Sequence, residues 1–238
     1  MTSSHCVLLA GGLGTRLTEI TGGLIPKALV EVGGIPFLHF KLLSLIQMGI
    51  TSVDILVGQH GDQIEQFVVG GSYPSISIRC FRDGPNLLGT AGAIASILDK
   101  LPSTFWVSYA DSYVIADIGQ ANKEFGNEED CIMVVLHNQD RVETSNVSID
   151  GVNDYVLEYV KNSPLGTHEW IDYGILRLTK ACFLSIAKDK PVDLREVILN
   201  QIQAEHMRTF QTNELFWDIG TPDRLEETTQ EFRRRGWV

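Results

Sequence analysis

The sequence lacks several features that would assign it to a common class of protein. It has no apolar run near the roughly 20 residues that a membrane-spanning helix requires. It also lacks a basic excess: the formal net charge of -11 argues against a binder of nucleic acid or anionic membranes. The opening MTSSHC has no basic region and the VLLA run is too short for a signal peptide, so we expect a cytoplasmic protein.

Metal-binding and nucleophile motifs are missing too. The cysteines Cys6, Cys80, Cys131 and Cys182 are scattered, with no C-x-x-C pair. Three of them lie in apolar, strand-like runs, which favours buried free thiols over the alternatives of disulfides or metal ligands. No H-E-x-x-H and no G-x-S-x-G motif occurs. The sequence therefore gives no support to zinc-protease or serine-hydrolase chemistry.

The 238 residues, 44% of them hydrophobic, are sufficient for one large domain with a substantial core. Strand-like and helix-like patterns alternate in the first half, which is typical of βαβ units and a mainly parallel sheet. We predict a single α/β domain spanning residues 1–238, with Asp62 and Thr221 as helix caps. The predicted strands are 6–9, 53–57, 76–81, 105–109, 131–136, 147–149, 155–160 and 171–178, and those at 147–149 and 155–160 form a hairpin. The predicted helices are 37–48, 62–69, 90–101, 117–125, 180–187, 194–205 and a last one that Thr221 and Pro222 begin.

Residues 7–29 contain the main motif: an apolar strand, a glycine-rich bend, Arg16 and then Pro26 and Lys27. Glycines allow a ligand to approach closely, and successive free N–H groups in such a bend bind anions. Arg16 and Lys27 add two positive charges, so the stretch is suited to a polyphosphate. It is not G-x-x-x-x-G-K-[ST], because no lysine follows the glycines directly, and not G-x-G-x-x-G, because Leu17 replaces the third glycine.

Two aspartates stand out by their positions in the chain. Asp111 follows the strand predicted at 105–109, where ligands collect in open α/β sheets. Asp218 lies in the run WDIGTP, directly before the last predicted helix. Each also has a purely structural explanation, as a turn, cap or surface residue.

The run LAGGLGTRL followed by PKAL resembles the nucleotide-binding loop of sugar-1-phosphate nucleotidyltransferases, whose pattern is close to G-G-x-G-T-R-L and a later P-K. The residues after Leu17 depart from the family's usual continuation. The resemblance covers nearly the whole chain and is most specific in this loop. It implies a Rossmann-like, mainly parallel mixed sheet flanked by helices, with a small antiparallel β insertion over the sugar site.

The resemblance also implies roles for individual residues. Arg16 and Lys27 would be catalytic, the first stabilising the departing pyrophosphate and the second neutralising the α-phosphate. Asp111, preceded by Ala110 in place of the family's glycine, and Asp218 would be Mg²⁺ ligands. The implied nucleotide-binding residues are Leu9, Ala10, Gly11, Gly12, Gly14, Thr15, Gly89 and Thr90. The implied sugar-phosphate-binding residues are Asn146, Glu158, Lys161, Asp172 and Gly174.

The implied reaction joins a nucleoside triphosphate and a sugar 1-phosphate, giving a nucleotide-sugar and pyrophosphate. The runs ADSY, SNV and IDYG look most like heptose-1-phosphate guanylyltransferases and N-acetylmuramate-1-phosphate uridylyltransferases. The leading expectation is D-glycero-D-manno-heptose 1-phosphate with GTP. The alternatives are N-acetylmuramate 1-phosphate, or a hexose 1-phosphate in a uridylyl- or thymidylyltransferase.

Two interpretations from other classes compete with this one. A nucleotide-sensing regulatory subunit of the same fold would be favoured by loss of a metal aspartate or of the loop lysine, and neither is missing. A dinucleotide-dependent oxidoreductase is disfavoured by the absent third glycine. The expected partners are the two substrates, with no nucleic acid and no membrane, and a homodimer is left open.

Overall fold

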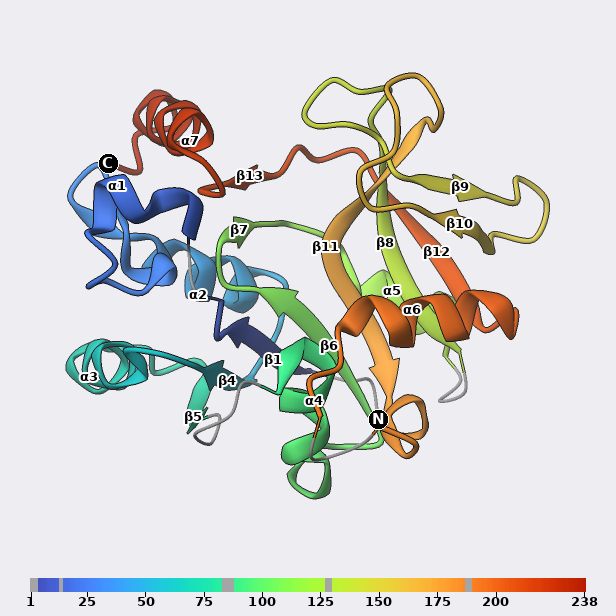
Figure 1. Ribbon diagram of the computed structural model, residues 1–238, viewed down its shortest axis with the longest axis horizontal. Helices are drawn as coiled ribbons and strands as arrows, with labels where there is room; N and C mark the ends of the chain where they lie inside the picture. The colour runs from blue at the N-terminus through green and yellow to red at the C-terminus, as the bar shows by residue number, and fades with distance from the viewer. Residues whose placement is uncertain (1–3, 13–14, 83–87, 127–129, 187–189) are drawn as a thin grey trace. The chain divides into compact units, whose positions relative to one another are not determined.

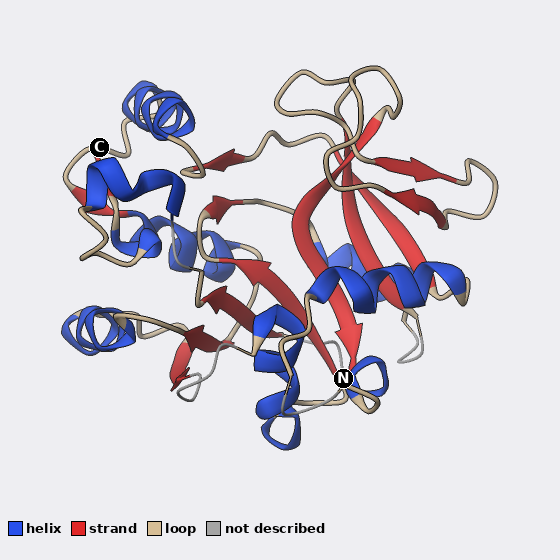
Figure 2. Ribbon diagram, viewed as in Figure 1, coloured by secondary structure: helices blue, strands red, loops and turns tan. Residues whose placement is uncertain are grey.

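The structure, a computed structural model, describes residues 4–12, 15–82, 88–126, 130–186 and 190–238 (Figure 1). The chain forms two compact units. The first unit consists of His5–Leu87, Ser108–Ile115 and Phe216–Val238, and the second of Met1–Ser4, Leu88–Val107 and Ala116–Leu215. Each unit contains both helices and strands (Figure 2), in agreement with the predicted α/β class.

The first unit is built on a parallel sheet. β1 (His5–Ala10), β4 (Ser52–Val57) and β5 (Ser77–Arg82) lie in the order β1-β4-β5, and β4 pairs in parallel with both neighbours. α2 (Phe37–Gln47) precedes β4, and α3 (Gly61–Gly70) joins β4 to β5, as the alternating pattern predicts. Successive residues of β1 and β4 are buried, so both faces of these strands are covered.

Segments from both ends of the chain meet in the first unit. α7 (Pro222–Arg234), red in Figure 1, packs against β2 (Glu31–Val32), which pairs with β3 (Ile35–Pro36). β13 (Trp217–Asp218) pairs antiparallel with β7 (Ser112–Tyr113). The remaining short segments are η1 (Thr15–Leu17), α1 (Thr18–Thr21) and η2 (Lys27–Leu29).

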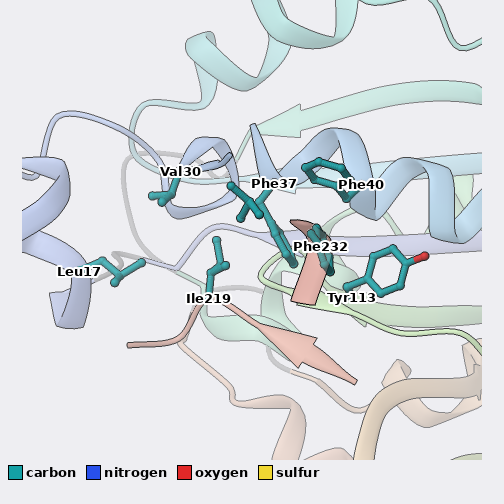
Figure 3. Close-up of a cluster of buried hydrophobic side chains, with 8 residues drawn as sticks. Leu17, Val30, Phe37, Phe40, Tyr113, Ile219 and Phe232 are labelled. Carbon is teal, nitrogen blue, oxygen red and sulfur yellow. The ribbon is translucent and has the colours of Figure 1, made fainter. Parts of the chain in front are cut away.

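A buried apolar cluster, which we call the aromatic cluster, joins these segments (Figure 3). The Phe232 ring of α7 lies edge-to-face with Phe40, at a centroid distance of 4.9 Å, and with Tyr113, at 5.3 Å. Leu17 and Ile219 are fully buried in the same cluster. Aromatic burial of this kind fixes the relative positions of the backbone segments involved. The members are Leu17, Val30, Val32, Phe37, Phe40, Tyr113, Ile219 and Phe232.

The second unit contains a mixed sheet with β8 (Cys131–His137) between two partners. β8 pairs in parallel with β12 (Met207–Thr212) and antiparallel with β11 (Trp170–Thr179). β11 also pairs with β9 (Val147–Ile149), which forms the predicted antiparallel hairpin with β10 (Val156–Tyr159). β6 (Thr104–Tyr109) has residues in both units. The helical segments of the second unit are α4 (Gly89–Ser96), η3 (Leu98–Lys100), α5 (Ile118–Glu124), η4 (Lys180–Phe183) and α6 (Leu194–Gln203).

Most predicted elements are confirmed, although α4 ends earlier than expected and β12 was not predicted. Thr221 caps α7 as predicted, because its hydroxyl accepts the Arg224 N–H at 3.3 Å and Pro222 follows it. The predicted aspartate cap of α3 is wrong. Its N-cap is His60, in a left-handed conformation with φ 61°, so the helix begins before Asp62.

The helix predicted at 180–187 is also wrong over its described part. Residues Lys180–Phe183 form only the short 3-10 turn η4. Phe183 is buried, but the side chain of Leu184 is 76% exposed, so no continuous apolar face extends along the segment. Without such a face, the cost of helix nucleation is not offset by packing. Residue 187 lies outside the described residues.

The first unit contains a fully buried lysine, Lys41. Lys41 of α2 donates a hydrogen bond from Nζ to Ser108 Oγ at 2.7 Å. Burial lowers the pKa of Lys41 to about 8, against opposing effects from Cys6 and Asp111. The charged form of a buried lysine is costly because the ammonium group loses its hydration. Lys41 therefore reduces the stability of the folded protein at neutral pH.

Replacing Lys41 with methionine should raise the free energy of unfolding at pH 7 by about 1–3 kcal/mol, because the buried charge is removed while the volume is kept. The gain should shrink as the pH rises from about 8 to about 10.5, because there folded wild type has lost the Lys41 proton while the unfolded chain still binds it. Urea unfolding at about pH 7 and about pH 9.5 measures this difference. Lys123→Met, at an exposed position of α5, is the control, and an equal gain at both pH values would contradict the expectation.

Candidate active site

The glycine loop begins where β1 ends. Leu9 is buried and Ala10 partly buried at the end of the strand, and Gly11 and Gly12 follow it, with Gly12 exposed. A Cβ on Gly12 would have no heavy atom within 4 Å, so the loop backbone is open to a ligand there. Two of the predicted nucleotide-binding positions lie outside the described part of the chain: Gly14 and the side chain of Thr15.

Gly58, which the sequence did not reveal, leaves room for this loop. Ala10 at the end of β1 pairs with Val57 at the end of β4, so the residues that follow the two strands are neighbours. A Cβ on Gly58 would lie 2.7 Å from the carbonyl oxygen of Gly11. A side chain at this position would displace the loop backbone, so the close approach requires glycine.

The two candidate metal ligands come together through the pairing of β7 with β13. Asp218 pairs with Ser112, the residue after Asp111. The N–H of Ile219 donates to the carbonyl oxygen of Asp111 at 3.0 Å, which extends the same backbone contact. Two aspartates that are distant in sequence therefore lie on adjacent backbone segments of the first unit.

Lys27 and Arg16 lie in the same region. Lys27, the first residue of η2, makes an ion pair with Asp111, with 2.5 Å between Nζ and Oδ2. A Cβ built on Gly220 would lie 2.9 Å from Asp218 Oδ1, 3.7 Å from Lys27 Nζ and 3.9 Å from a terminal nitrogen of Arg16. The space about Gly220 is thus bordered by two cationic groups and a carboxylate, and a side chain would fill it.

Asp218 is oriented by three groups that were not predicted. Its Oδ1 accepts the Gly220 N–H at 2.7 Å, and its Oδ2 accepts the Arg224 Nε–H at 2.8 Å. The Thr228 hydroxyl donates to the Asp218 carbonyl oxygen at 2.6 Å. The sequence contains one hint of these contacts: Arg224 lies in the first turn of the helix predicted to begin after the Thr221 cap.

The donor set fits a hard divalent cation. Asp111 and Asp218 supply carboxylate oxygens, each with lone pairs beyond the bonds described above. Within the described ranges, no group of three or more His, Cys, Asp or Glu side chains could hold a metal ion by itself. Mg²⁺ suits such a set, because it commonly binds through one or two carboxylates and completes its shell with water and phosphate oxygens.

Three of the predicted sugar-binding residues form a second cluster, in the second unit. Asn146 Oδ1 accepts the Asp172 N–H at 3.0 Å, and Asp172 Oδ1 accepts the Gly174 N–H at 2.9 Å. Burial raises the pKa of Asp172 to about 6, against the opposing effect of hydrogen bonds from Gly174 and Tyr159. Gly174 has φ 82°, a left-handed conformation that favours glycine, at a register shift of β11.

The other two predicted sugar-binding residues differ in their surroundings. Glu158 of β10 accepts a bond from His168 Nε2 at 3.2 Å, and the other ring nitrogen of His168 lies 2.7 Å from Ser163 Oγ. Glu158 therefore belongs to a network that joins the hairpin to the loop following it. Lys161, two residues after the end of β10, is exposed.

Gly89 and Thr90 make contacts within the second unit. The N–H of Leu194, the first residue of α6, donates to Thr90 Oγ1 at 2.7 Å. Gly89 has φ 71°, and a Cβ there would lie 2.5 Å from the Val192 carbonyl oxygen. Thr90 thus links the start of α4 to the start of α6, and Gly89 allows the chain before α6 to approach closely. The sequence did not indicate these structural roles.

None of the helices in the described residues combines the length and apolar character needed to cross a membrane.

Comparison with known proteins identifies the family. A family model described as Nucleotidyl transferase matches residues 5–235. The D-glycero-alpha-D-manno-heptose 1-phosphate guanylyltransferase of Campylobacter jejuni is 27% identical over 220 residues, covering 92% of this chain and 96% of that protein. The probable mannose-1-phosphate guanylyltransferase 1 of Oryza sativa is 27% identical over 225 residues, which are 91% of this chain and 61% of that protein. This chain therefore spans less than two thirds of the rice relative.

The fold is similar to that of a crystal structure of HddC from Yersinia pseudotuberculosis complexed with GMP-PN. The TM-score is 0.82 and the identity 26%, with 96% of this chain and 99% of that chain covered. This likeness confirms the predicted fold class, a mainly parallel mixed sheet flanked by helices. With a family model that matches nearly its whole length, the chain belongs to the nucleotidyl transferase family and is an enzyme that transfers nucleotidyl groups.

Proposed function

We propose that this enzyme joins a nucleoside triphosphate to a sugar 1-phosphate, giving a nucleotide-sugar and pyrophosphate. The observation that carries the proposal is the grouping of Arg16, Lys27 and Asp218 about Gly220, with Asp111 paired to Lys27. The C. jejuni and rice relatives, both named as sugar-1-phosphate guanylyltransferases, support the same reaction.

The chemistry is an in-line displacement at the α-phosphate. The attacking oxygen of the sugar phosphate is already ionised, so positioning and charge neutralisation account for catalysis and no general base is required. Following the family resemblance, Gly11 and Gly12 are assigned to the base and ribose, and Gly14, Thr15 and Arg16 to the triphosphate. Lys27 exchanges its contact with Asp111 for the α-phosphate, and Arg16 stabilises the negative charge of the departing pyrophosphate.

Asp111 and Asp218 are assigned to a Mg²⁺ ion on the basis of the donor set described above. When bound, such an ion supplies Lewis-acid charge neutralisation at the phosphates. The bonds from Gly220 and Arg224 orient the Asp218 carboxylate before any ligand arrives. This preorganisation avoids an ordering cost during the reaction.

In the second unit we assign Lys161 to the sugar phosphate, because its exposed ammonium group is a point charge suited to a phosphate. Asp172 and Gly174 are assigned to the sugar hydroxyls. Asn146 orients Asp172 by accepting its N–H. Glu158, which accepts a bond from His168, is assigned to the sugar phosphate with Lys161. Gly89 and Thr90 remain candidates for contact with the base.

The leading substrates are GTP and D-glycero-D-manno-heptose 1-phosphate. Support comes from the C. jejuni relative, which is matched over nearly its full length, and from the likeness to HddC complexed with GMP-PN. The free thiols of all four cysteines are typical of a reducing compartment, so the proposal includes a cytoplasmic location.

Pyrophosphate release, measured over a panel of substrate pairs, tests the reaction and its specificity. GTP with the heptose 1-phosphate should react at least about 10-fold faster, in kcat/KM, than UTP or dTTP with glucose 1-phosphate or N-acetylmuramate 1-phosphate. If UTP with N-acetylmuramate 1-phosphate reacts fastest, the guanylyl assignment is wrong. Nucleotide binding without release from any pair would instead support a regulatory subunit.

Replacing Lys27 with alanine or Asp111 with asparagine should lower kcat/KM by about 100- to 1,000-fold, since each removes a charge that acts on the reacting phosphate. Steady-state kinetics with the best substrate pair measures the loss, and thermal unfolding confirms that the variants fold. Lys123→Ala, at an exposed position, is the matched control and should retain wild-type kinetics. Near-normal turnover of either site variant would eliminate its catalytic role.

Replacing Arg224 with methionine should raise the Mg²⁺ concentration that gives half-maximal activity by about 10-fold, because Asp218 loses the donor that orients it. At saturating Mg²⁺ the change in kcat should be smaller. Arg233→Met, at an exposed position of the same helix, is the control. A loss of kcat with an unchanged Mg²⁺ requirement would show that Arg224 does not act through the metal ligand.

A further inference from the structure

Two of the four cysteines are in direct contact. Cys131 is the first residue of β8, and Cys182 lies in η4, which follows β11. Their Sγ atoms are 3.3 Å apart, although 51 positions separate them in sequence. Both carry free thiols; Cys131 is fully buried and Cys182 only partly.

The strand pairing explains why these thiols meet. β11 runs antiparallel to β8, and Arg177 pairs with Ile132, so the end of β11 lies beside the start of β8. The chain then turns through η4 and brings Cys182 back toward Thr179, whose Oγ1 lies 3.4 Å from the Cys182 sulfur. The contact is thus fixed by the pairing of β11 with β8 and by the short turn η4.

The two thiols differ in chemical character. A hydrogen bond from the Cys131 thiol favours the thiolate of Cys182 and lowers its pKa, while the same contact together with burial raises the pKa of Cys131. The thiolate is the nucleophile in thiol–disulfide exchange. Cys182 is only partly buried, and the buried Cys131 lies beside it.

We propose that Cys131 and Cys182 form a reversible dithiol–disulfide site that reacts with low-molecular-weight disulfides such as glutathione disulfide. The Cys182 thiolate attacks one sulfur of the reagent, forming a mixed disulfide and releasing one glutathione thiolate, which takes the proton from Cys131. The Cys131 thiolate then attacks the Cys182 sulfur, forming the intrachain bond and releasing the second glutathione. Two protein thiols are oxidised and one glutathione disulfide is reduced.

Closure needs only a small movement. A disulfide requires about 2.05 Å between sulfurs, so the two atoms must approach by about 1 Å. The new bond would tie the start of β8 to η4 and would close a long loop in the unfolded chain, which stabilises the folded state. Oxidation should therefore raise Tm, by roughly 5 °C.

The full-length protein, incubated with glutathione disulfide and then alkylated under denaturing conditions, tests the proposal. Free thiols should fall from four to two, peptide mapping should identify a Cys131–Cys182 link, and dithiothreitol should restore both the thiols and the lower Tm. Retention of all four thiols, or a link between any other pair, would overturn it. This outcome does not depend on nucleotidyl transfer, which can succeed or fail separately.

Two serine variants separate the roles of the sulfurs. With glutathione disulfide, Cys131→Ser should stop at a stable mixed disulfide on Cys182. Cys182→Ser should lose free thiol at least about 10-fold more slowly than wild type. Cys80→Ser is the matched control, because Cys80 is also partly buried but its pKa is raised to about 11 by burial; it should form the link at the wild-type rate. Equal rates of thiol loss in Cys182→Ser and wild type would show that Cys182 is not the attacking thiol. This conclusion holds even if the serine variants are less stable.

Discussion

The positions of the four charged candidate site residues depend on packing in the aromatic cluster of the first unit. Each of the four charged residues lies next to, or a few positions before, a member of this buried cluster in the sequence. Since a buried side chain is restrained by packing on all sides, the backbone beside it is held in place, and a charged residue close in the chain starts from that fixed backbone. The pairs are Arg16 with Leu17, Lys27 with Val30, Asp111 with Tyr113 and Asp218 with Ile219. Phe232 of α7 completes the cluster and thereby couples the last helix to the first loop.

This arrangement gathers positive charge locally in a protein whose formal net charge is -11. The region about Gly220 is bordered by Arg16 and Lys27, and Arg224 offsets the charge of Asp218. The ion pair between Lys27 and Asp111 is partly buried, with exposed side-chain fractions of 14% and 35%, so it is screened less than a surface pair. Local positive charge, rather than net charge, sets the potential that a triphosphate encounters at short range.

Residue patterns alone were sufficient for the elements whose burial is encoded locally. β1, α2 and β8 have strong apolar patterns and lie where predicted. β7 and β13 could not be predicted, because a strand of two residues has no periodicity, yet their pairing brings Asp111 and Asp218 together. Arg224 was missed for a similar reason: its bond to Asp218 arises only after tertiary packing. The charged residues were singled out by their positions in the sequence, and the family resemblance gave them their roles. The common location of Arg16, Lys27 and Asp218 about Gly220 emerged only from the structure.

In the second unit, backbone conformation decides chemistry that residue spacing does not encode. The register of β11 against β8 shifts between Asp172 and Leu176, and Gly174 takes a positive φ within that shift. The bulge directs the Gly174 N–H to Asp172, while burial raises the pKa of Asp172 to about 6. Near that pH the carboxyl group changes between accepting and donating a hydrogen bond. The hydrogen-bonding character of Asp172 thus depends on the local bulge and on pH as well as on residue identity.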